Sequence, residues 1–301
     1  MKRIVSVSLG SSRRNHRARL ELLGETIEIE RIGTDGDMQK AIALIRELDG
    51  KVDAFGMGGT DLYLVAGRRR YILRASLPLA RAAVRTPIVD GSGLKNTLER
   101  RVVRQLARDG VIDFRNKRVL VTVAVDRFGM AEALAETGCE LVLGDLIFAL
   151  GIPIPLRSLR ALERLAAVIA PIATRLPLSV LYPTGRKQEE TVPRHDRFFA
   201  WADVIAGDWH YVRRHMPASL QDKIILTNTV TPEDVELLRQ RGAAMLVTTT
   251  PELNGRSFGT NVMEAVLVAV SGRRPEELGP ADYERLLDEL DFKPRIERLR
   301  P

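Results

Sequence analysis

Short apolar runs rich in β-branched residues alternate with amphipathic segments along most of the chain. The runs have the length of buried strands, and the amphipathic segments repeat their apolar positions at helical spacing. In the first third this pattern predicts strands at residues 3–8, 26–31, 52–55 and 87–89, a hairpin at 62–66 and 71–73, and helices at about 37–48 and 94–107. Strands that alternate with helices are typical of parallel sheets with crossover helices, so the predicted fold class is α/β.

The pattern is clearer from residue 118 onward. RVLVTVAV, residues 118–125, predicts a continuous buried strand, and a helix at 130–136 and a strand at 139–144 complete one βαβ unit. Further strands are expected at 178–181, 203–206, 223–226 and 245–248, with helices at about 158–174, 232–240 and 260–270. Six parallel strands with intervening helices predict a Rossmann-like, doubly wound sheet.

The length of 301 residues suits one large or two ordinary domains. We predict a small N-terminal α/β domain for substrate over residues 1–112 and the Rossmann-like domain over residues 113–274. Residues 275–301 are expected to form a final helix that packs back on the first domain.

The amino-acid composition limits the kinds of partner that we expect the protein to bind. The net charge of +7 comes mostly from arginine and suggests a small anionic molecule as partner. A single cysteine, Cys139, excludes a disulfide framework and a cysteine-rich zinc module, and no apolar stretch is long enough for a bilayer, so we expect a cytoplasmic protein with no membrane partner. Aromatic residues are 5% of the chain and no known module is present, so we do not expect nucleic-acid binding. The apolar helices are compatible with a homodimer.

Ligands of open α/β sheets bind beyond the carboxyl ends of the strands. The first such loop of the second domain holds Asp126, Arg127, Phe128 and Gly129, and Asp145 closes the next strand. We predict that these residues bind NAD or NADP, with Asp145 on the adenine ribose. The loop has one glycine where a dinucleotide fingerprint has three, and Asp145 could instead cap the following helix.

Two loops of the first domain predict a substrate site. FGMGGTD holds three glycines whose bare amides can approach a ligand, and VDGSGLKNT gathers a carboxylate and a lysine where a strand meets a helix. The predicted substrate-binding residues here are Gly58, Gly59, Thr60, Asp61, Ser92 and Asn96. Lys95 and Asp90 are the predicted catalytic residues, because a lysine whose pKa is lowered by burial can exchange a proton with a hydroxyl. The alternatives are a hairpin entry for the glycines and a helix cap for Asp90 or Ser92.

Later loops add further candidates. Thr184 and Gly185 are predicted to contact the cofactor, and Asn254 and Arg256 to clamp an anion. Asp208, His210 and Asn228 also follow predicted strands and could face the same crevice. The histidines lack metal-ligand spacing, so no metal site is predicted.

Four segments, VDRFGMAEAL, GDLIFALGIPIP, LYPTGRKQ and TPELNGRSFGTN, resemble a bacterial family usually labelled quinate 5-dehydrogenase. The resemblance extends over nearly the full chain and implies that NAD(P) oxidises a ring hydroxyl. It also implies an α/β domain followed by a Rossmann-like domain and terminal helices.

Three functions follow from this sequence. The leading hypothesis is an NAD(P)-dependent oxidoreductase that acts on a hydroxylated carboxylic acid in a cleft between the domains. A non-redox Rossmann-like enzyme, such as a transferase or lyase, would use the same cleft for an anionic or phosphorylated metabolite, as the missing glycines suggest. A binding protein without catalysis is the third hypothesis.

Overall fold

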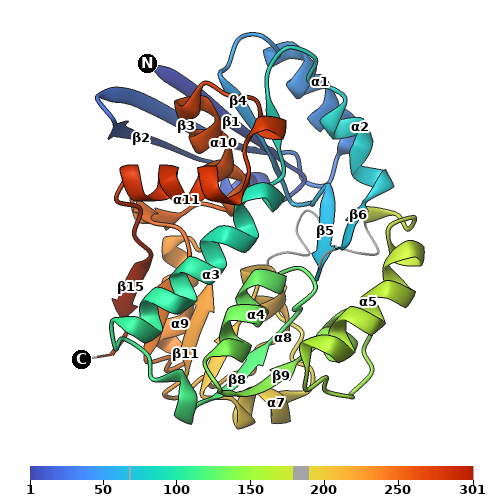
Figure 1. Cartoon of the computed structure of the whole chain (residues 1–301), viewed down its shortest axis with the longest axis vertical. Coiled ribbons are helices and arrows are strands. Elements are labelled where there is room, and N and C mark those ends of the chain that lie inside the picture. The colour runs from blue at the N-terminus through green and yellow to red at the C-terminus, as the bar shows by residue number, and fades with distance from the viewer. Residues whose placement is uncertain (68, 179–189, 301) are drawn as a thin grey trace.

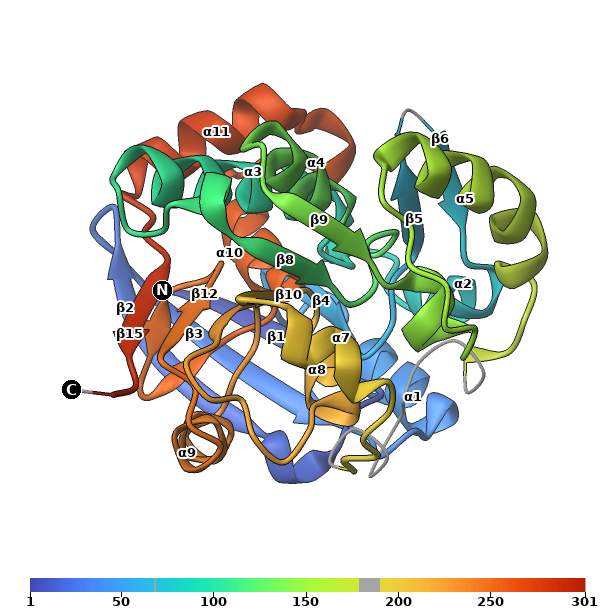
Figure 2. The ribbon, with the colours of Figure 1, turned by 90° about the horizontal axis from the view of Figure 1, so that it is seen from below.

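The structure is a computed structural model that describes residues 1–67, 69–178 and 190–300. Two sheets occupy the upper and lower parts of the molecule in Figure 1, and helices cover them. Figure 2 gives the view from below. Most strands in both sheets run parallel, which confirms the α/β class with two domains.

The first sheet has the strand order β2-β3-β1-β4-β7. Its strands are β1 (Lys2–Ser8), β2 (His16–Leu22), β3 (Glu25–Gly33), β4 (Ala54–Gly58) and β7 (Ile88–Val89). All are parallel except β2, which pairs antiparallel with β3 at the edge. The sequence analysis predicts no strand at β2, because HRARLEL carries charged residues on the face that an edge strand turns to solvent.

The second sheet has the order β15-β12-β11-β10-β8-β9. Its strands are β8 (Arg118–Val121), β9 (Glu140–Leu143), β10 (Val204–Ala206), β11 (Ile224–Thr227), β12 (Met245–Thr248) and β15 (Arg295–Arg298). The parallel strands agree with the prediction, but β8 ends at Val121, four residues earlier than predicted, because the chain then turns toward the cleft. The predicted strand at 178–181 lies outside the described residues except for Leu178. The sixth strand is instead β15, antiparallel to β12.

Helices pack on both faces of these sheets. They are α1 (Met38–Leu48), α2 (Leu77–Ala80), α3 (Ser92–Arg108), α4 (Phe128–Glu136), α5 (Leu159–Ala173), α7 (Asp196–Trp201), α8 (Trp209–His215), α9 (Pro232–Gln240), α10 (Thr260–Ser271) and α11 (Pro280–Glu289). Single helical turns are η1 (Ser12–Arg14), η2 (Arg74–Ser76), η3 (Phe114–Asn116), η4 (Asp145–Ala149) and η6 (Pro275–Glu277). None of the helices in the described ranges is long and apolar enough to cross a membrane.

Alternate residues of β1 enter different apolar clusters, as the pleat of a strand requires. Ile4 packs in one cluster with Val266 of α10, whereas Val5 packs in another with Ile45 of α1. The first cluster also contains Val119 of β8, so one apolar core runs from the first sheet into the second.

The chain passes between the two sheets several times. Helix α3 leads from the first sheet to the second, α10 returns to pack on β1, β4 and β7, and β15 ends in the second sheet. Helix α11 packs on α3 and α10, near the first sheet, as predicted, but the rest of the tail differs from the prediction because it ends in β15, which pairs with β12 of the second sheet. We expected residues 113–274 to lie together, but α10 belongs to the first sheet because its apolar residues cover that sheet's face.

Two small hairpins complete the described part of the fold. Strands β5 (Tyr63–Ala66) and β6 (Arg69–Ile72) form the predicted hairpin, which contacts α3 and α5. Strands β13 (Glu252–Leu253) and β14 (Arg256–Ser257) form the second one, close to the start of α10.

Candidate functional site

The carboxyl ends of strands from both sheets meet at a polar cavity of about 100 Å³. The first sheet contributes residues that follow β4 and β7, the second sheet contributes residues that follow β8, β10 and β11, and α10 contributes its first turn. The lining residues are Met57, Gly59, Thr60, Asp61, Asp90, Lys95, Asp126, Arg127, Asp208, His210, Tyr211, Asn228, Thr229, Gly259, Thr260 and Asn261. This is the position at which open α/β sheets bind ligands. The volume suits a small polar molecule, since sites for drug-sized ligands measure roughly 300–1,000 Å³.

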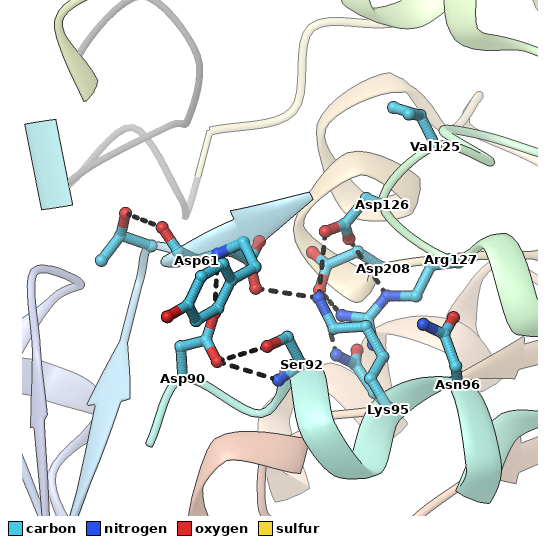
Figure 3. Close-up of polar contacts among 12 residues, drawn as sticks. Asp61, Asp90, Ser92, Lys95, Asn96, Val125, Asp126, Arg127 and Asp208 are labelled. Atoms are coloured by element: carbon cyan, nitrogen blue, oxygen red, sulfur yellow. Dashed lines mark hydrogen bonds and ion pairs between the residues drawn. The ribbon is translucent and has the colours of Figure 1, made fainter. Parts of the chain in front are cut away.

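Lys95 lies at the centre of the charged residues in this cavity. It projects from the first turns of α3, and its Nζ donates to Asp61 Oδ1 at 2.8 Å and to Asp126 Oδ1 at 3.1 Å (Figure 3). Burial would lower the pKa of Lys95, but the charges of Asp126 and Asp61 outweigh it and raise the pKa above its ordinary value. The prediction of a lysine with a lowered pKa is therefore wrong, and Lys95 is a fixed positive charge at neutral pH.

Asp61 is the carboxyl group of this cluster that titrates near neutrality. Burial, together with the neighbouring charges of Asp126 and Asp90, raises the pKa of Asp61 to about 7, although Lys95 opposes the shift. The pKa of Asp126 moves the other way: Lys95 and Arg127 overcome its burial and hold it well below the ordinary value. Two carboxyl groups on one lysine thus differ in protonation, an arrangement that suits one of them to proton transfer.

Arg127 is buried and held by three carboxylates. Its Nη1 donates to Glu99 Oε1 at 2.6 Å and its Nη2 to Asp208 Oδ2 at 2.7 Å, while its Nε lies 3.1 Å from Asp126 Oδ2. These charges raise its pKa despite burial. The guanidinium is therefore engaged inside the protein and serves to position Asp126 and Asp208.

Asp90 has a structural role in place of the predicted catalytic one. Its Oδ2 accepts the amides of Leu62 and Tyr63 at 2.6 and 3.0 Å, and its Oδ1 accepts the amide and hydroxyl of Ser92 at 3.0 and 2.7 Å (Figure 3). These four bonds fasten the loop that carries Asp61 to the start of α3. Asp90 thus fixes the distance between Asp61 and Lys95.

The residues predicted to hold NAD or NADP do not fit a dinucleotide where it was placed. The amide of Gly129 donates to Asn96 Oδ1 at 2.9 Å, and a Cβ on Gly129 would lie 2.6 Å from the Asn96 carbonyl oxygen, so α3 closes off the start of α4. Phe128 is a core residue with 2% of its surface exposed. Asp145 is buried and accepts the amides of Ala124 and Val125 at 3.1 and 2.8 Å, which fixes the loop after β8.

The polar role of Asp145 is therefore internal, and it neither caps the following turn nor offers a free carboxylate to a ribose. Burial raises its pKa to about 6. A pyrophosphate at this place would lack the free amides of a helix N-terminus.

The other predicted residues divide between the cavity and the scaffold. Gly58 and Gly59 pack against Ser8 and the amide of Gly10, and Thr60 bonds to Ser76, so these residues mainly join β1, β4 and η2. Gly59 and Thr60 nevertheless line the cavity, whereas Ser92 and Asn96 lie beside it. Thr184 and Gly185 lie outside the described residues.

Asn254 and Arg256, which we predicted to bind an anion, are not among the described residues that line the cavity. Asn254 is exposed and forms, with Gly255, the turn between β13 and β14. Both residues have positive φ, 54° and 82°, as a two-residue hairpin turn requires. Arg256, the first residue of β14, is buried and belongs to a second cluster of charges, described below.

Five residues that line the cavity are not among the predicted substrate-binding residues: Asp208, His210, Tyr211, Asn228 and Thr260. Asp208 Oδ2 accepts from Asn228 Nδ2 at 3.0 Å, and Arg127 lowers the pKa of Asp208 although burial opposes this. Burial lowers the pKa of His210 to about 4, with the charges of Arg14 and Arg31 in the same direction, so His210 is neutral at pH 7. The position of Asp208, His210 and Asn228 after predicted strands was the signal for them in the sequence, and their place in one crevice is confirmed.

A second cavity of about 370 Å³ adjoins the polar one. Asp126 and Tyr211 line both, and the rest of its wall is mostly aliphatic, with Leu162 and Ile169 of α5 among its members. Within the described lining, its charged groups are the carboxylates Asp126 and Asp145, which would repel a pyrophosphate. In the described residues no group of three or more His, Cys, Asp or Glu side chains is arranged to hold a metal ion.

Comparisons with known proteins assign no activity. Two family models match the chain: residues 3–90 match a domain of unknown function (DUF8753), and residues 93–299 match another domain of unknown function (DUF8754). No curated protein sequence matches. The resemblance to quinate 5-dehydrogenases therefore stays a prediction.

Solved structures with a similar course of the chain have low sequence identity. A galactofuranose binding protein is 13% identical, with 97% of this chain and 99% of that chain covered and a TM-score of 0.37. GanP, a glucose-galactose binding protein from Geobacillus stearothermophilus, is 11% identical, with 99% and 97% covered and a TM-score of 0.39. A hetero-hexameric glutamate dehydrogenase from Thermus thermophilus is 13% identical, with 96% and 74% covered and a TM-score of 0.42. At such scores these likenesses say nothing about what this chain binds.

Proposed function

Because the chain belongs to the family described as a domain of unknown function (DUF8754), we propose its function from the cleft alone: it binds a small hydroxylated metabolite and transfers a proton at one of its hydroxyls without redox chemistry. The observation that carries this proposal is the buried ammonium of Lys95 between Asp61 and Asp126, at the carboxyl ends of both sheets.

The chemistry of the cavity suits hydroxyl groups. Its wall holds carboxylates, the ammonium of Lys95 and the neutral amides of Asn228 and Asn261, so a polyol would meet both acceptors and donors. The pKa of Asp61, raised to about 7 by burial, allows this carboxylate to accept a hydroxyl proton and the carboxylic acid to return it. The ammonium of Lys95 would stabilise the negative charge that develops on the ligand oxygen.

A hydride-transfer step has no support in this geometry, because the residues expected around a dinucleotide are engaged within the protein. The non-redox reading, a lyase or transferase acting on a hydroxylated metabolite, is therefore the one that the cleft supports best. A binding protein would use the same contacts but would show no turnover.

We would test this proposal by thermal-shift titration with a panel of polyols, sugar acids and sugar phosphates. A ligand at 100 times its Kd is expected to stabilise the protein by about 2.7 kcal/mol. Lys95→Met is expected to weaken binding of that ligand by about tenfold or more, because a charged hydrogen bond is lost. Lys40→Met, on the exposed surface of α1, is the matched control and should bind as the wild type does.

Three results would decide between the readings. Unchanged affinity in Lys95→Met, or no shift with any member of the panel, would contradict the proposed site. A saturable shift with NAD, NADH, NADP or NADPH would restore the oxidoreductase hypothesis. If Lys95→Met does not fold, Asp61→Asn replaces it, and the expected result is a loss of turnover with affinity changed less.

A further inference from the structure

A second group of buried charges lies beside the cavity and takes no part in the proposed proton transfer. Arg14, Arg31 and Arg256 are 6%, 8% and 3% exposed. They come from η1, β3 and the hairpin β13–β14, and the guanidinium of Arg256 donates to the backbone oxygen of Arg14.

Positive charge exceeds negative charge in this group. Asp234, which is fully buried, accepts from Arg14 Nη1 at 2.9 Å and from Arg213 Nη1 at 2.6 Å. Arg31 and Arg256, in contrast, bond to neutral oxygens: Arg31 donates to Ser11 O at 3.0 Å and to Ser8 Oγ at 2.9 Å. The acidic groups that act on them from farther away are the exposed Asp35 for Arg31, and for Arg256 the buried Asp234, which Arg14 and Arg213 already share, and the exposed Glu233.

The surplus of positive charge, together with burial, lowers the pKa values of two of these arginines. Burial, with Arg256 and Arg14 nearby, lowers the pKa of Arg31 to about 9, and burial with Arg14 lowers that of Arg256 to about 9. Taking a guanidinium out of water without a counter-charge costs several kcal/mol. An anion that accepted hydrogen bonds from these guanidinium groups would offset this cost.

Several buried side-chain nitrogen atoms in and near this group also lack a hydrogen-bond partner among the described residues. Among the described residues, Arg14 Nη2 and Arg256 Nε are buried and have no hydrogen-bond partner, and neither have His16 Nε2 and His210 Nδ1. Arginine side chains, with their planar fork of donors, match the oxygens of phosphate.

The group borders the cavity. His210 lines the cavity, and the charges of Arg14 and Arg31 contribute to the lowered pKa of its imidazole. Thr229, another lining residue, donates to the carbonyl of Ser257, the neighbour of Arg256, at 3.1 Å. Arg14, Arg31 and Arg256 are not among the described lining residues, but a ligand that extended past His210 and Thr229 would approach them.

We propose that Arg14, Arg31 and Arg256 recognise a phosphate monoester carried by the hydroxylated ligand of the cleft. The inference rests on the proposed function, since it names the charged group of that same ligand. A phosphate fits better than a carboxylate, because the two guanidinium groups of Arg31 and Arg256 have no carboxylate partner and Arg14 shares Asp234 with Arg213, which together favour a dianion. The substrate class is then a phosphorylated polyol or hydroxy acid.

The test uses inorganic phosphate as the probe. The melting temperature of the full-length protein is measured against phosphate concentration, with chloride at matched ionic strength as the reference. We expect a saturable rise with phosphate in the wild type and an apparent Kd weakened by about tenfold or more in Arg256→Gln. Arg118→Gln removes an exposed arginine that pairs with Asp203 and should respond as the wild type does.

The stability of the variant without phosphate provides a second readout. Since Arg256 is surplus charge, Arg256→Gln is expected to melt no lower than the wild type in chloride alone. If it does not fold, Arg31→Gln is measured in its place. Equal phosphate responses in wild type and variant, or a response to acetate equal to that to phosphate, would overturn the proposal.

Lys95→Met separates this proposal from the previous one. It is expected to keep the phosphate response, because Lys95 is not among the three arginines. If phosphate binds but Lys95→Met binds hydroxylated ligands normally, the proposed function fails and the phosphate site stands. If Lys95 is needed for ligand binding but phosphate has no effect, the phosphate site alone fails.

Discussion

Lys95 shows how a neighbour far along the chain can reverse an expectation drawn from one residue. Its own loop suggests a buried lysine with a lowered pKa, but Asp61 and Asp126 stand 34 and 31 residues away in sequence and 2.8 and 3.1 Å away in space. Two carboxylates outweigh the cost of burial for the ammonium. The proton-transfer role consequently passes from the lysine to Asp61.

Asp61 should make stability depend on pH in a defined direction. Its pKa is about 7 in the folded protein, against an ordinary value of 3.8, so between these values the folded state binds more protons than the unfolded state. Its stabilising contribution is complete below the ordinary value and is lost as pH rises through about 7. Asp61→Asn stays neutral, so we expect it to gain stability relative to the wild type by about 4 kcal/mol between about pH 4 and pH 8.

Urea unfolding at several pH values measures this difference. Asp109→Asn, at an exposed position, is the control and should follow the wild-type curve. Parallel curves for Asp61→Asn and the wild type would show that Asp61 ionises as an ordinary aspartate does.

Among the elements, α4 illustrates why the loop after β8 is not a cofactor site. Its first turn lies directly on α3, with Gly129 against the backbone of Asn96. Helix contacts of this kind fill the space where a dinucleotide loop would leave amides free. The single glycine in this loop therefore serves helix packing.

Gly129→Ala tests this packing. A Cβ at this position would lie 2.6 Å from the Asn96 carbonyl oxygen and 2.7 Å from its Cα, so the two helices would have to separate. We expect the free energy of unfolding to fall by about 1–3 kcal/mol, as in overpacked cores, despite the higher helix propensity of alanine. Ala135→Ser, on the exposed side of the same helix, should change stability far less. A Gly129→Ala protein as stable as the wild type would mean that α3 and α4 do not approach so closely.

Elements with a local signal were predictable, and those defined by distant partners were not. Apolar runs predicted β1, β11 and β12, and Thr231 before Pro232 marks the start of α9, where it forms a capping box with Asp234. Strand β2 was missed because its sequence is half charged, and β15 because its pairing with β12 depends on the whole intervening chain. The rule that ligands bind beyond the carboxyl ends of the strands located the cleft correctly. It could not say which carboxylates would surround Lys95, nor that Arg14 and Asp234, 220 residues apart in sequence, would form an ion pair.

At the scale of the whole molecule, the two sheets share their helices. Helix α10 covers the first sheet although it follows the second in sequence, and its start lies against Gly56 of β4. The family models divide the chain between residues 90 and 93, whereas the fold requires α10 to complete the first sheet.

This arrangement predicts that a fragment of residues 1–90 does not fold alone. Without α10, the face of the first sheet that holds Ile4 and Ala54 would be exposed to water. Each buried aliphatic side chain contributes about 1.5–3 kcal/mol, so the loss of several exceeds the stability of a typical domain. We expect poor dispersion in the ¹H–¹⁵N spectrum of the fragment, with the full chain as the control. A dispersed spectrum and a cooperative melt would contradict the shared fold.

The contacts of Arg127 also bear on how sequences of this family can diverge. Arg127 joins Glu99 of α3 to Asp208 at the start of α8, and Glu99 is fully buried, with its Oε2 lacking a hydrogen bond among the described residues. Replacing the arginine alone would leave a buried carboxylate unpaired, which typically costs about 3–5 kcal/mol. A chain that lost Arg127 would therefore also need to lose the buried charge of Glu99, whereas a chain that lost Glu99 alone would keep Arg127 paired with Asp126 and Asp208.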